Sequence, residues 1–406
     1  MEKYFFVLGR YPEISLSEIQ SVLKKNNLNN IPEVSSSEIA VFELSSGFDT
    51  HSVFKSLGGS IKYGIILGEV SLIDDQKDFQ KYFESSYLIE KVIPQGLKKV
   101  HFGLSIYVAG AKREITKKLE ENLLDFQLNI KNNLKDALIK AGFLRIKEKS
   151  LSSVAVEKNH LLQKGFELDL LALSEKIMIG KTQGVQDFES FARRDMFRPK
   201  KDKKSGILPV KLARMMVNLL PEMPRVILDP FCGSGTILME AALLGVKKLI
   251  GTDIQKRAID DTKTNLEWVI KQFNLNKNEF RFDLKTSDIR FLDKEIPKNS
   301  INAIVTEPFL GPPLFREPDE FQSQKIIKEL TPLYSDSFKV FDFILSPGGV
   351  TVFIFPFFLS KVKNIFFDKN IIQPRSGGAR FKILDSYNYS SPGQFVGREI
   401  VVLKKN

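Results

Sequence analysis

The residues best placed for chemistry in this 406-residue chain form a glycine-containing run, Asp229-Pro230-Phe231-Cys232-Gly233-Ser234-Gly235-Thr236. The run lies between a predicted strand at 226–228 and a predicted helix at 236–244. Glycine lets a turn pass close to a ligand, and the helix that follows presents free backbone amides at its N-terminus. The run therefore predicts a binding site for a small polar molecule.

Carboxylates narrow the choice of that molecule. Asp253 ends the next predicted strand, where it can accept hydrogen bonds from both hydroxyls of a ribose, as in a nicotinamide, flavin or sulfonium cofactor. A dinucleotide loop needs three spaced glycines beside a pyrophosphate. Asp229 would repel that group and can instead pair with the amino group of a methionine moiety. Asp288 ends a further strand and either accepts from an adenine amino group or caps a helix. We expect a sulfonium cofactor bound by Asp229, Phe231, Gly233, Gly235, Thr236, Asp253, Ile254 and Asp288.

The cysteine and histidine content limits the chemistry further. Methylation at carbon 5 of a pyrimidine usually needs a thiolate that attacks the ring, and the single cysteine, Cys232, lies inside the cofactor loop. Methylation of an amine, a hydroxyl or a ring nitrogen stays open. One cysteine and three scattered histidines favour neither a disulfide nor a metal site, so we expect no metal and a reducing compartment.

Basic residues are densest at 193–204, where seven basic and two acidic side chains occur. The run either contacts nucleic-acid phosphates or is a solvated linker between two folded units. The net charge of +11 fits a polyanionic partner but also fits a lysine-rich composition bias. The candidate phosphate-binding residues are Arg193, Arg194, Arg198, Lys200, Lys201, Lys203 and Lys204.

The elements that must position these residues indicate an α/β protein with more than one domain. From residue 206 onward, strands and helices alternate, which is typical of a parallel sheet covered on both faces. Its strands are predicted at 226–228, 248–251, 281–285, 301–305 and 350–355, its helices at 236–244, 256–273 and 322–345, and a closing hairpin at 381–385 and 399–403.

The residues before this region indicate two small α+β units. Residues 1–90 combine strands at 4–8, 39–44 and 61–67 with a helix at 16–23. The second unit has predicted strands at 98–108, 143–147, 153–157 and 165–173 and helices at 114–127 and 134–141. The chain shows no secretory signal and no apolar run of membrane length, so we expect a cytoplasmic protein without a membrane anchor.

The loop at 229–235 closely resembles that of class I S-adenosylmethionine-dependent methyltransferases, in the form found in amino-methyltransferases of nucleic acids. That family carries Asp, Asn or Ser followed by Pro-Pro-aromatic at the end of its fourth strand. Here the corresponding residues are Glu307-Pro308-Phe309-Leu310. The resemblance implies that Glu307 and the carbonyl of Pro308 accept hydrogen bonds from the target amine while Phe309 stacks on the base. Glutamate is one methylene longer than aspartate, and the second proline and the tyrosine are replaced, so the geometry of this site departs from the family.

Three further segments resemble the tRNA guanine-10 N2-methyltransferase family: 192–199, 206–219 and 389–400. Residues 181–187 resemble the last strand of its tRNA-binding THUMP domain. The resemblance implies a ferredoxin-like domain at 1–90, a THUMP-like domain at 91–190, a basic linker at 191–205 and a Rossmann-like methyltransferase domain at 206–406.

The family resemblance implies a tRNA methyltransferase that uses S-adenosylmethionine to methylate the exocyclic N2 of a guanosine, at position 10 of tRNA. One alternative is an rRNA or DNA amino-methyltransferase, because the cofactor and amine motifs are shared. Another is a tRNA-binding protein without catalysis, because Glu307-Pro308-Phe309 departs from the family pattern. The sequence leaves open whether one or two methyl groups are added, the oligomeric state and the need for a small activating subunit.

Overall fold

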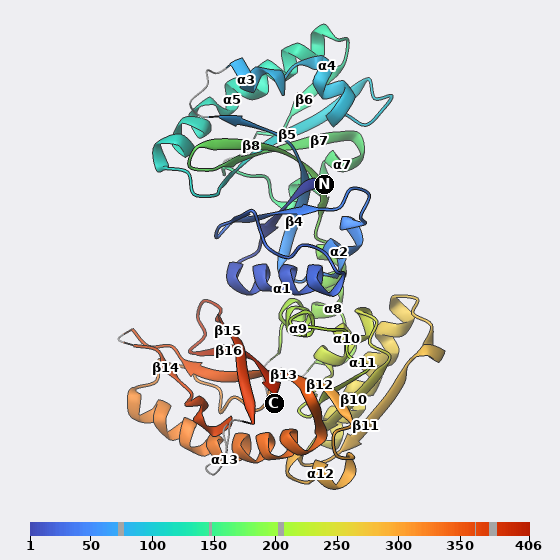
Figure 1. Cartoon of the computed structure of the whole chain (residues 1–406), viewed down its shortest axis with the longest axis vertical. Coiled ribbons are helices and arrows are strands. Elements are labelled where there is room, and N and C mark those ends of the chain that lie inside the picture. The colour runs from blue at the N-terminus through green and yellow to red at the C-terminus, as the bar shows by residue number, and fades with distance from the viewer. Residues whose placement is uncertain (72–76, 146–147, 202–206, 362, 373–379) are drawn as a thin grey trace. The chain divides into compact units, whose positions relative to one another are not determined.

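The computed structural model describes residues 1–71, 77–145, 148–201, 207–361, 363–372 and 380–406. The chain divides into two compact units, Met1–Phe188 and Glu189–Asn406. Each contains one large sheet (Figure 1). Among the helices of the described residues, none is both long enough and apolar enough to span a bilayer.

The N-terminal unit is built on an eight-stranded mixed sheet in the order β2-β3-β1-β4-β8-β7-β5-β6. Strand β5 runs parallel to β6 and β7, whereas the other neighbours pair antiparallel. The strands are β1 (Glu2–Leu8), β2 (Val34–Ser35), β3 (Ile39–Leu44), β4 (Ser60–Ser71), β5 (Lys99–Val108), β6 (Lys140–Phe143), β7 (Gly165–Ala172) and β8 (Lys176–Val185). The helices are α1 (Pro12–Lys25), α2 (Thr50–Ser56), α3 (Lys77–Lys81), α4 (Ser85–Tyr87), η1 (Leu88–Val92), α5 (Arg113–Asp136), α6 (Ser153–Lys158) and α7 (Leu161–Lys164).

Pairing of β4 with β8 joins the early and late parts of this unit into one sheet. The apolar side chains form separate clusters around β1 and around β5, including Phe6 and Phe42 in one and Phe102 and Phe166 in the other. The division into a ferredoxin-like domain at 1–90 and a THUMP-like domain at 91–190 stays a prediction.

Two predictions in the N-terminal unit are wrong, and the strand predicted at 143–147 lies earlier in the chain, as β6 at Lys140–Phe143. The predicted strand at 153–157 is helix α6, because the side chain of Ser152 accepts a hydrogen bond from the amide of Ala155 and caps that helix. The predicted helix at 134–141 does not form, because α5 ends at Asp136 and the following residues lead into strand β6 beside β5. In both places the run of apolar residues is too short for its spacing to distinguish a helix from a strand, and the neighbouring structure decides the conformation.

The C-terminal unit contains a sheet in the order β11-β10-β9-β12-β13-β16-β15. The first five of these strands are parallel, and β16 and β15 close the edge as the antiparallel hairpin that the sequence predicts. The strands are β9 (Val226–Asp229), β10 (Lys248–Asp253), β11 (Arg281–Thr286), β12 (Ile301–Thr306), β13 (Leu345–Phe358), β14 (Ile365–Phe366), β15 (Phe381–Tyr389) and β16 (Val396–Lys405). The helices are α8 (Phe188–Met196), α9 (Val210–Asn218), α10 (Thr236–Leu243), α11 (Lys256–Gln272), η2 (Lys277–Glu279), η3 (Ile289–Phe291), α12 (Leu292–Glu295), α13 (Glu320–Ile344) and η4 (Lys369–Ile372).

This strand order positions the site. Strand β9 lies between β10 and β12. From β9 the chain adds β10 and β11 toward one edge of the sheet, and it then adds β12 and β13 toward the other edge. Ligands of such sheets bind where the direction of winding changes, at the carboxyl ends of the strands. On one face, the apolar side of α13 packs around Tyr334 and Phe338 against Phe353 and Phe355 of β13. This aromatic core holds the end of β12 in place.

Candidate active site

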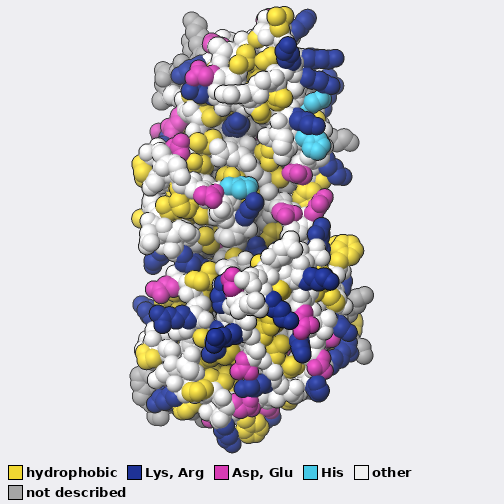
Figure 2. Space-filling model, turned by 90° about the vertical axis from the view of Figure 1, so that its right-hand side faces the viewer, with side chains coloured by type: hydrophobic (Ala, Val, Ile, Leu, Met, Phe, Trp, Pro, Cys, Tyr) yellow, Lys and Arg dark blue, Asp and Glu magenta, His cyan; other side chains and the backbone are white. Residues whose placement is uncertain are grey.

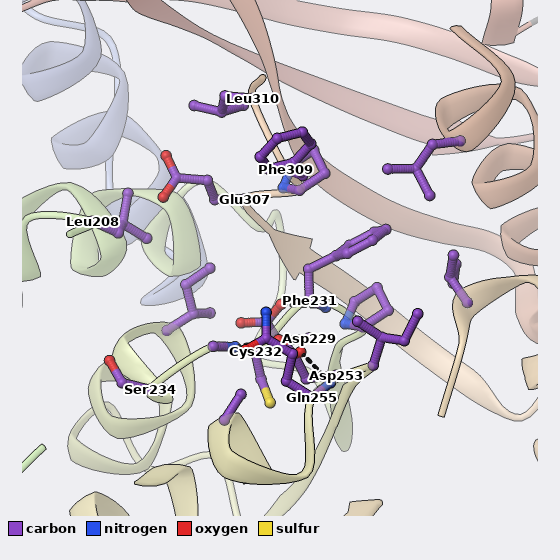
Figure 3. A pocket seen from close by; sticks show the side chains of 18 of the residues that line it. Leu208, Asp229, Phe231, Cys232, Ser234, Asp253, Gln255, Glu307, Phe309 and Leu310 are labelled. Atoms are coloured by element: carbon purple, nitrogen blue, oxygen red, sulfur yellow. Dashed lines mark hydrogen bonds between the residues drawn. The ribbon is translucent and has the colours of Figure 1, made fainter. Parts of the chain in front are cut away.

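A pocket of about 640 Å³ opens at the carboxyl ends of β9, β10 and β12 (Figure 3). Seven predicted cofactor residues line it: Asp229, Phe231, Gly233, Thr236, Asp253, Ile254 and Asp288. The three predicted catalytic residues Glu307, Pro308 and Phe309 line it as well. In Figure 3, Glu307, Phe309 and Leu310 lie toward one end, and Asp229, Cys232 and Asp253 lie toward the other.

The glycines give the loop its shape. Gly233 and Gly235 have φ angles of +51° and +79°, which residues other than glycine rarely adopt. A Cβ atom on Gly235 would also come within 2.8 Å of the side chain of Thr262. Gly235 is the N-cap residue of α10, and the hydroxyl of Thr262 donates a hydrogen bond to the carbonyl of Gly233 at 2.8 Å. Together these contacts hold the loop tightly against α11.

Asp229 is buried at the end of β9. Its Oδ1 accepts hydrogen bonds from the Thr306 hydroxyl at 2.7 Å and from the Phe231 amide at 3.2 Å. Burial raises the pKa of Asp229 to about 7, against the lowering effect of these two hydrogen bonds. A buried carboxyl of this kind favours a cationic ligand, because the cation stabilises its charged form.

Asp253 connects the cofactor loop to β10. Its carboxylate accepts hydrogen bonds from the amide of Gly233 at 3.0 Å and from the amide of Gln255 at 2.9 Å. Each carboxylate oxygen has further lone pairs, so both contacts leave capacity for two ribose hydroxyls. Gln255 also lines the pocket, although the sequence carried no signal that singled it out.

Asp288 takes one of the two roles that the sequence left open, that of a helix cap, and its contact with an adenine amino group stays a prediction. Its side chain caps the short helix η3 by accepting from the Arg290 amide, and it pairs with the Arg290 guanidinium at 2.5 Å. These hydrogen bonds hold the pKa of Asp288 below its usual range. Both residues line the pocket, so the ionised carboxylate also borders the space expected for a nucleobase.

Glu307, which follows β12, is paired with Arg398 of β16. Nε of Arg398 donates a hydrogen bond to Oε1 of Glu307 at 2.6 Å, and both side chains are largely buried. Arg398 also lines the pocket. The sequence placed this arginine only in a segment that resembles the family, because nothing in its local spacing indicates that it reaches residue 307.

The segment after Glu307 is held in place by contacts with helix α13. The hydroxyl of Tyr334 on α13 donates a hydrogen bond to the carbonyl of Phe309 at 2.8 Å. Gly311 has a φ of +103°, and a Cβ atom there would come within 2.8 Å of Ile326. The ring of Phe309 remains 56% exposed, so it offers an open face beside the pocket.

The basic run at 193–204 does not act as one group. Arg194 is 2% exposed and is bonded to Glu240, so the prediction that it contacts phosphate is wrong. Its position on the buried face of α8 explains this, since Arg214 also pairs with Glu240 and both guanidinium groups lie over the ring of Phe191. The predicted linker at 191–205 is thus helical at its start.

The other basic residues lie in three kinds of place. Arg193, Lys200 and Lys201 are not buried, and the backbone at Lys200 is hydrogen-bonded to the side chain of Asn265. Arg198 is buried and lines the pocket. Lys203 and Lys204 lie outside the described residues. On the face that Figure 2 shows, Lys and Arg side chains are spread over both units with Asp and Glu among them.

Cys232 is buried in the cofactor loop, with its sulfur 3.5 Å from the hydroxyl of Thr262. Burial raises the pKa of this thiol well above its usual range. The thiolate that carbon-5 methylation requires is therefore strongly disfavoured. Within the described residues, no group of three or more His, Cys, Asp or Glu side chains is placed to hold a metal ion.

Two family models match parts of this chain. Residues 198–356 match a model described as an RMKL-like methyltransferase domain. Residues 74–264 match a model described as a DNA methylase. Both matches include the loop with Asp229 and also Asp253, but only the first extends to Glu307.

Curated relatives match parts of this chain. The chain is 40% identical over 108 residues to the tRNA (guanine(10)-N2)-dimethyltransferase of Methanothermobacter thermautotrophicus, covering 26% of this chain and 28% of the relative. It is 31% identical over 201 residues to the protein of the same name from Methanocaldococcus jannaschii, covering 47% and 51%. The matches therefore span between about a quarter and a half of the length of these relatives.

Solved structures show the same fold along the chain. TrmN from Thermus thermophilus superposes with a TM-score of 0.55 at 16% identity, covering 100% of both chains. A possible methylase from Clostridium difficile 630 superposes with a TM-score of 0.53 at 14% identity, covering 98% of this chain and 97% of that one. The sheet order, the glycine loop at its switch point and the match over residues 198–356 agree, and the C-terminal unit of this chain has the class I methyltransferase fold.

Proposed function

We propose that this protein is a tRNA methyltransferase that transfers a methyl group from S-adenosylmethionine to the exocyclic N2 of a guanosine. The observation that carries this proposal is the position of Glu307 on the pocket that holds the cofactor loop, with its carboxylate oriented by Arg398. The choice of guanosine 10 in tRNA is supported by the names of the two relatives described above.

The pocket suits S-adenosylmethionine in size and in chemistry. Its volume of about 640 Å³ lies in the range of small-molecule sites. Asp229 would accept from the ammonium group, Asp253 from the ribose hydroxyls and Asp288 from the adenine amino group. Phe231, Gly233, Thr236 and Ile254 line the pocket and would shape the walls around the cofactor. Gly235 does not line the pocket and would act by allowing the tight turn of the loop.

The residues after β12 would prepare the amine for attack. The exocyclic nitrogen of guanine is a poor nucleophile, because its lone pair is conjugated with the ring. Glu307 and the backbone carbonyl of Pro308 would accept its two hydrogens and turn the lone pair toward the methyl group. Phe309 would stack on the base after it leaves its helix. The sulfonium supplies an activated methyl group, so the chain itself needs to orient the amine and accept its proton.

The exposed basic residues would contribute to the grip on RNA. Arg193 and Lys200 are exposed and Lys201 is half-buried, and all three lie before the methyltransferase sheet. Cations at such positions hold a substrate by its phosphates without reading its sequence. We assign placement of the tRNA chiefly to the N-terminal unit, as a THUMP-like domain would do, and we place the protein in the cytoplasm where its substrate is processed.

Methyl incorporation from labelled S-adenosylmethionine tests the proposal directly. Bulk tRNA, rRNA and duplex DNA are supplied in parallel, and N2-methylguanosine is identified in the digested product. The proposal requires incorporation into tRNA well above that into DNA and rRNA, with loss of roughly 100-fold or more in Glu307→Ala. Equal labelling of DNA would contradict it and favour an amino-methyltransferase of DNA.

The DNA alternative has one specific observation behind it, the match of residues 74–264 to a DNA methylase model. That match ends before Glu307, so it concerns the cofactor loop rather than the amine site. A non-catalytic tRNA-binding protein is the remaining alternative. It would bind tRNA and cofactor, yet Glu307→Ala and the unaltered protein would transfer equally little methyl.

A further inference from the structure

Arg198, between α8 and α9, is a buried cation on the wall of the pocket. The residue is 3% exposed, and its Nε and Nη1 have no hydrogen-bond partner within the part of the chain that the structure describes. Buried arginines normally satisfy their donors, because an unpaired charge in a low-dielectric site is costly. At this wall the structure thus has donors in place for which the described residues supply no acceptor.

The other buried arginines of this unit show the contrast. Arg194 and Arg214 each donate from Nε to the carboxylate of Glu240 at 2.6 Å, and Arg398 donates to Glu307 at the same distance. Glu240 is therefore already shared by two cations. Both Asp195 and Glu240 are near enough to favour the charged form of Arg198, but burial outweighs them and lowers its pKa. An anionic ligand would restore the balance.

The surroundings of Arg198 suit a carboxylate. Ser234 and Thr236, at the start of α10, line the same pocket. Gly235 caps that eight-residue helix without a side chain that could occupy its first amides. The positive end of the helix dipole and the guanidinium therefore both favour an anion in this pocket.

An α-amino acid carries an ammonium and a carboxylate on one carbon, and this pocket has a matching pair. Asp229 provides a buried carboxyl group for the ammonium, and Arg198 provides a buried guanidinium for the carboxylate. A nucleic-acid phosphate, which the sequence suggested as the partner of Arg198, would instead need a cation exposed at the surface.

We infer that Arg198 binds the α-carboxylate at the methionine end of the cofactor, opposite the ammonium held by Asp229. This inference rests on the proposed use of S-adenosylmethionine. It assigns Arg198 to the cofactor rather than to tRNA, and it makes the carboxylate a determinant of cofactor specificity.

Binding of two ligands that differ only in the carboxylate tests this role. S-adenosylmethionine and its decarboxylated form are titrated into the purified full-length protein by calorimetry without RNA. The unaltered protein should prefer S-adenosylmethionine by roughly 10- to 100-fold, as expected for loss of a charge-assisted pair. In Arg198→Met this preference should fall to about threefold or less, because the affinity for S-adenosylmethionine should fall while the affinity for the decarboxylated ligand should barely change.

Matched variants separate the outcomes. Arg193→Met removes an exposed arginine of the same run and should leave both affinities unchanged. Arg198→Lys keeps a cation and should restore part of the preference, and it serves if the methionine variant does not fold. An equal loss for both ligands would overturn the inference and assign Arg198 a purely structural role. Reduced tRNA binding with both cofactor affinities unchanged would overturn it in favour of a phosphate contact. If neither ligand bound the unaltered protein, the proposed function itself would fail.

Discussion

Nε of Arg398 donates a hydrogen bond to Oε1 of Glu307 at 2.6 Å, although the two residues are 91 positions apart. Strand β16 brings the arginine to this place by pairing antiparallel with β13, which itself pairs with β12. The guanidinium fixes the orientation of a carboxylate that is one methylene longer than the aspartate expected from the resemblance. The unusual glutamate and this arginine therefore form one ion-paired unit on the pocket wall, where we propose that the amine binds.

Loss of this arginine should reduce turnover more than binding. In Arg398→Met the carboxylate of Glu307 keeps its place in the chain but loses its fixed orientation, so we expect kcat to fall by roughly 10- to 100-fold. KM for tRNA and the affinity for S-adenosylhomocysteine should change less than about threefold, as steady-state kinetics and calorimetry would show. Arg398→Lys should recover part of the rate.

A matched control is Arg380→Met, which removes an arginine paired with Asp342 at the surface of the same unit. It should leave kcat unchanged. If Arg398→Met raised KM for tRNA while kcat stayed intact, Arg398 would be a tRNA contact rather than a positioning residue.

Cofactor affinity should depend on pH through Asp229. Its folded pKa is about 7, above the usual 3.8, so the neutral form predominates in the empty pocket at acidic pH. Because an ammonium ligand needs the ionised carboxylate, affinity for S-adenosylhomocysteine should rise between about pH 5.5 and 7.5. Calorimetry across this range should show weaker binding and a flat profile in Asp229→Asn.

The same group should affect stability with the opposite sign. Its bound proton stabilises the folded state fully below the unfolded pKa, and this contribution is lost as pH rises through about 7. Denaturant unfolding without ligand should therefore show stability falling across that window, and Asp229→Asn should remove this part of the dependence. A pH profile of stability that is the same in both proteins would contradict the assignment.

Glu240 should be a stability residue. It is fully buried and is paired with both Arg194 and Arg214. Glu240→Gln leaves two buried cations without a charged partner, so we expect it to lower the free energy of unfolding by about 3–5 kcal/mol. Chemical denaturation would measure this loss. The matched control is Glu279→Gln, which removes an exposed pair with Lys247 and should change stability little.

Cys232 should be dispensable for methyl transfer. Burial keeps its thiol protonated, so it is no nucleophile, and Cys232→Ala should retain the transfer rate within about threefold. The same thiol should react with iodoacetamide far more slowly in the folded protein than after unfolding. A loss of activity of roughly 100-fold or more with normal cofactor binding would contradict the exclusion of thiolate chemistry.

Local sequence was enough to predict the cofactor loop and the elements around it. The run at 229–236, the strand and helix on its two sides and the later strands up to β13 are confirmed by the fold. Local patterns succeed here because one strand-turn-helix unit contains both the glycines and the helix start. Parallel strands in chain order then bring the residues that follow their carboxyl ends to one edge. For the same reason the sequence alone places Asp253 and Glu307 at the pocket.

Only the tertiary structure decided which charged side chains belong together. The sequence groups Arg194 and Arg198 in one basic run, yet packing of α8 buries the first against Glu240 and places the second on the pocket wall. It also leaves Arg398 in a distant closing strand, which sheet pairing brings to Glu307. Such partnerships depend on contacts between residues far apart in the chain, and these contacts form when apolar faces of helices and sheet are buried together.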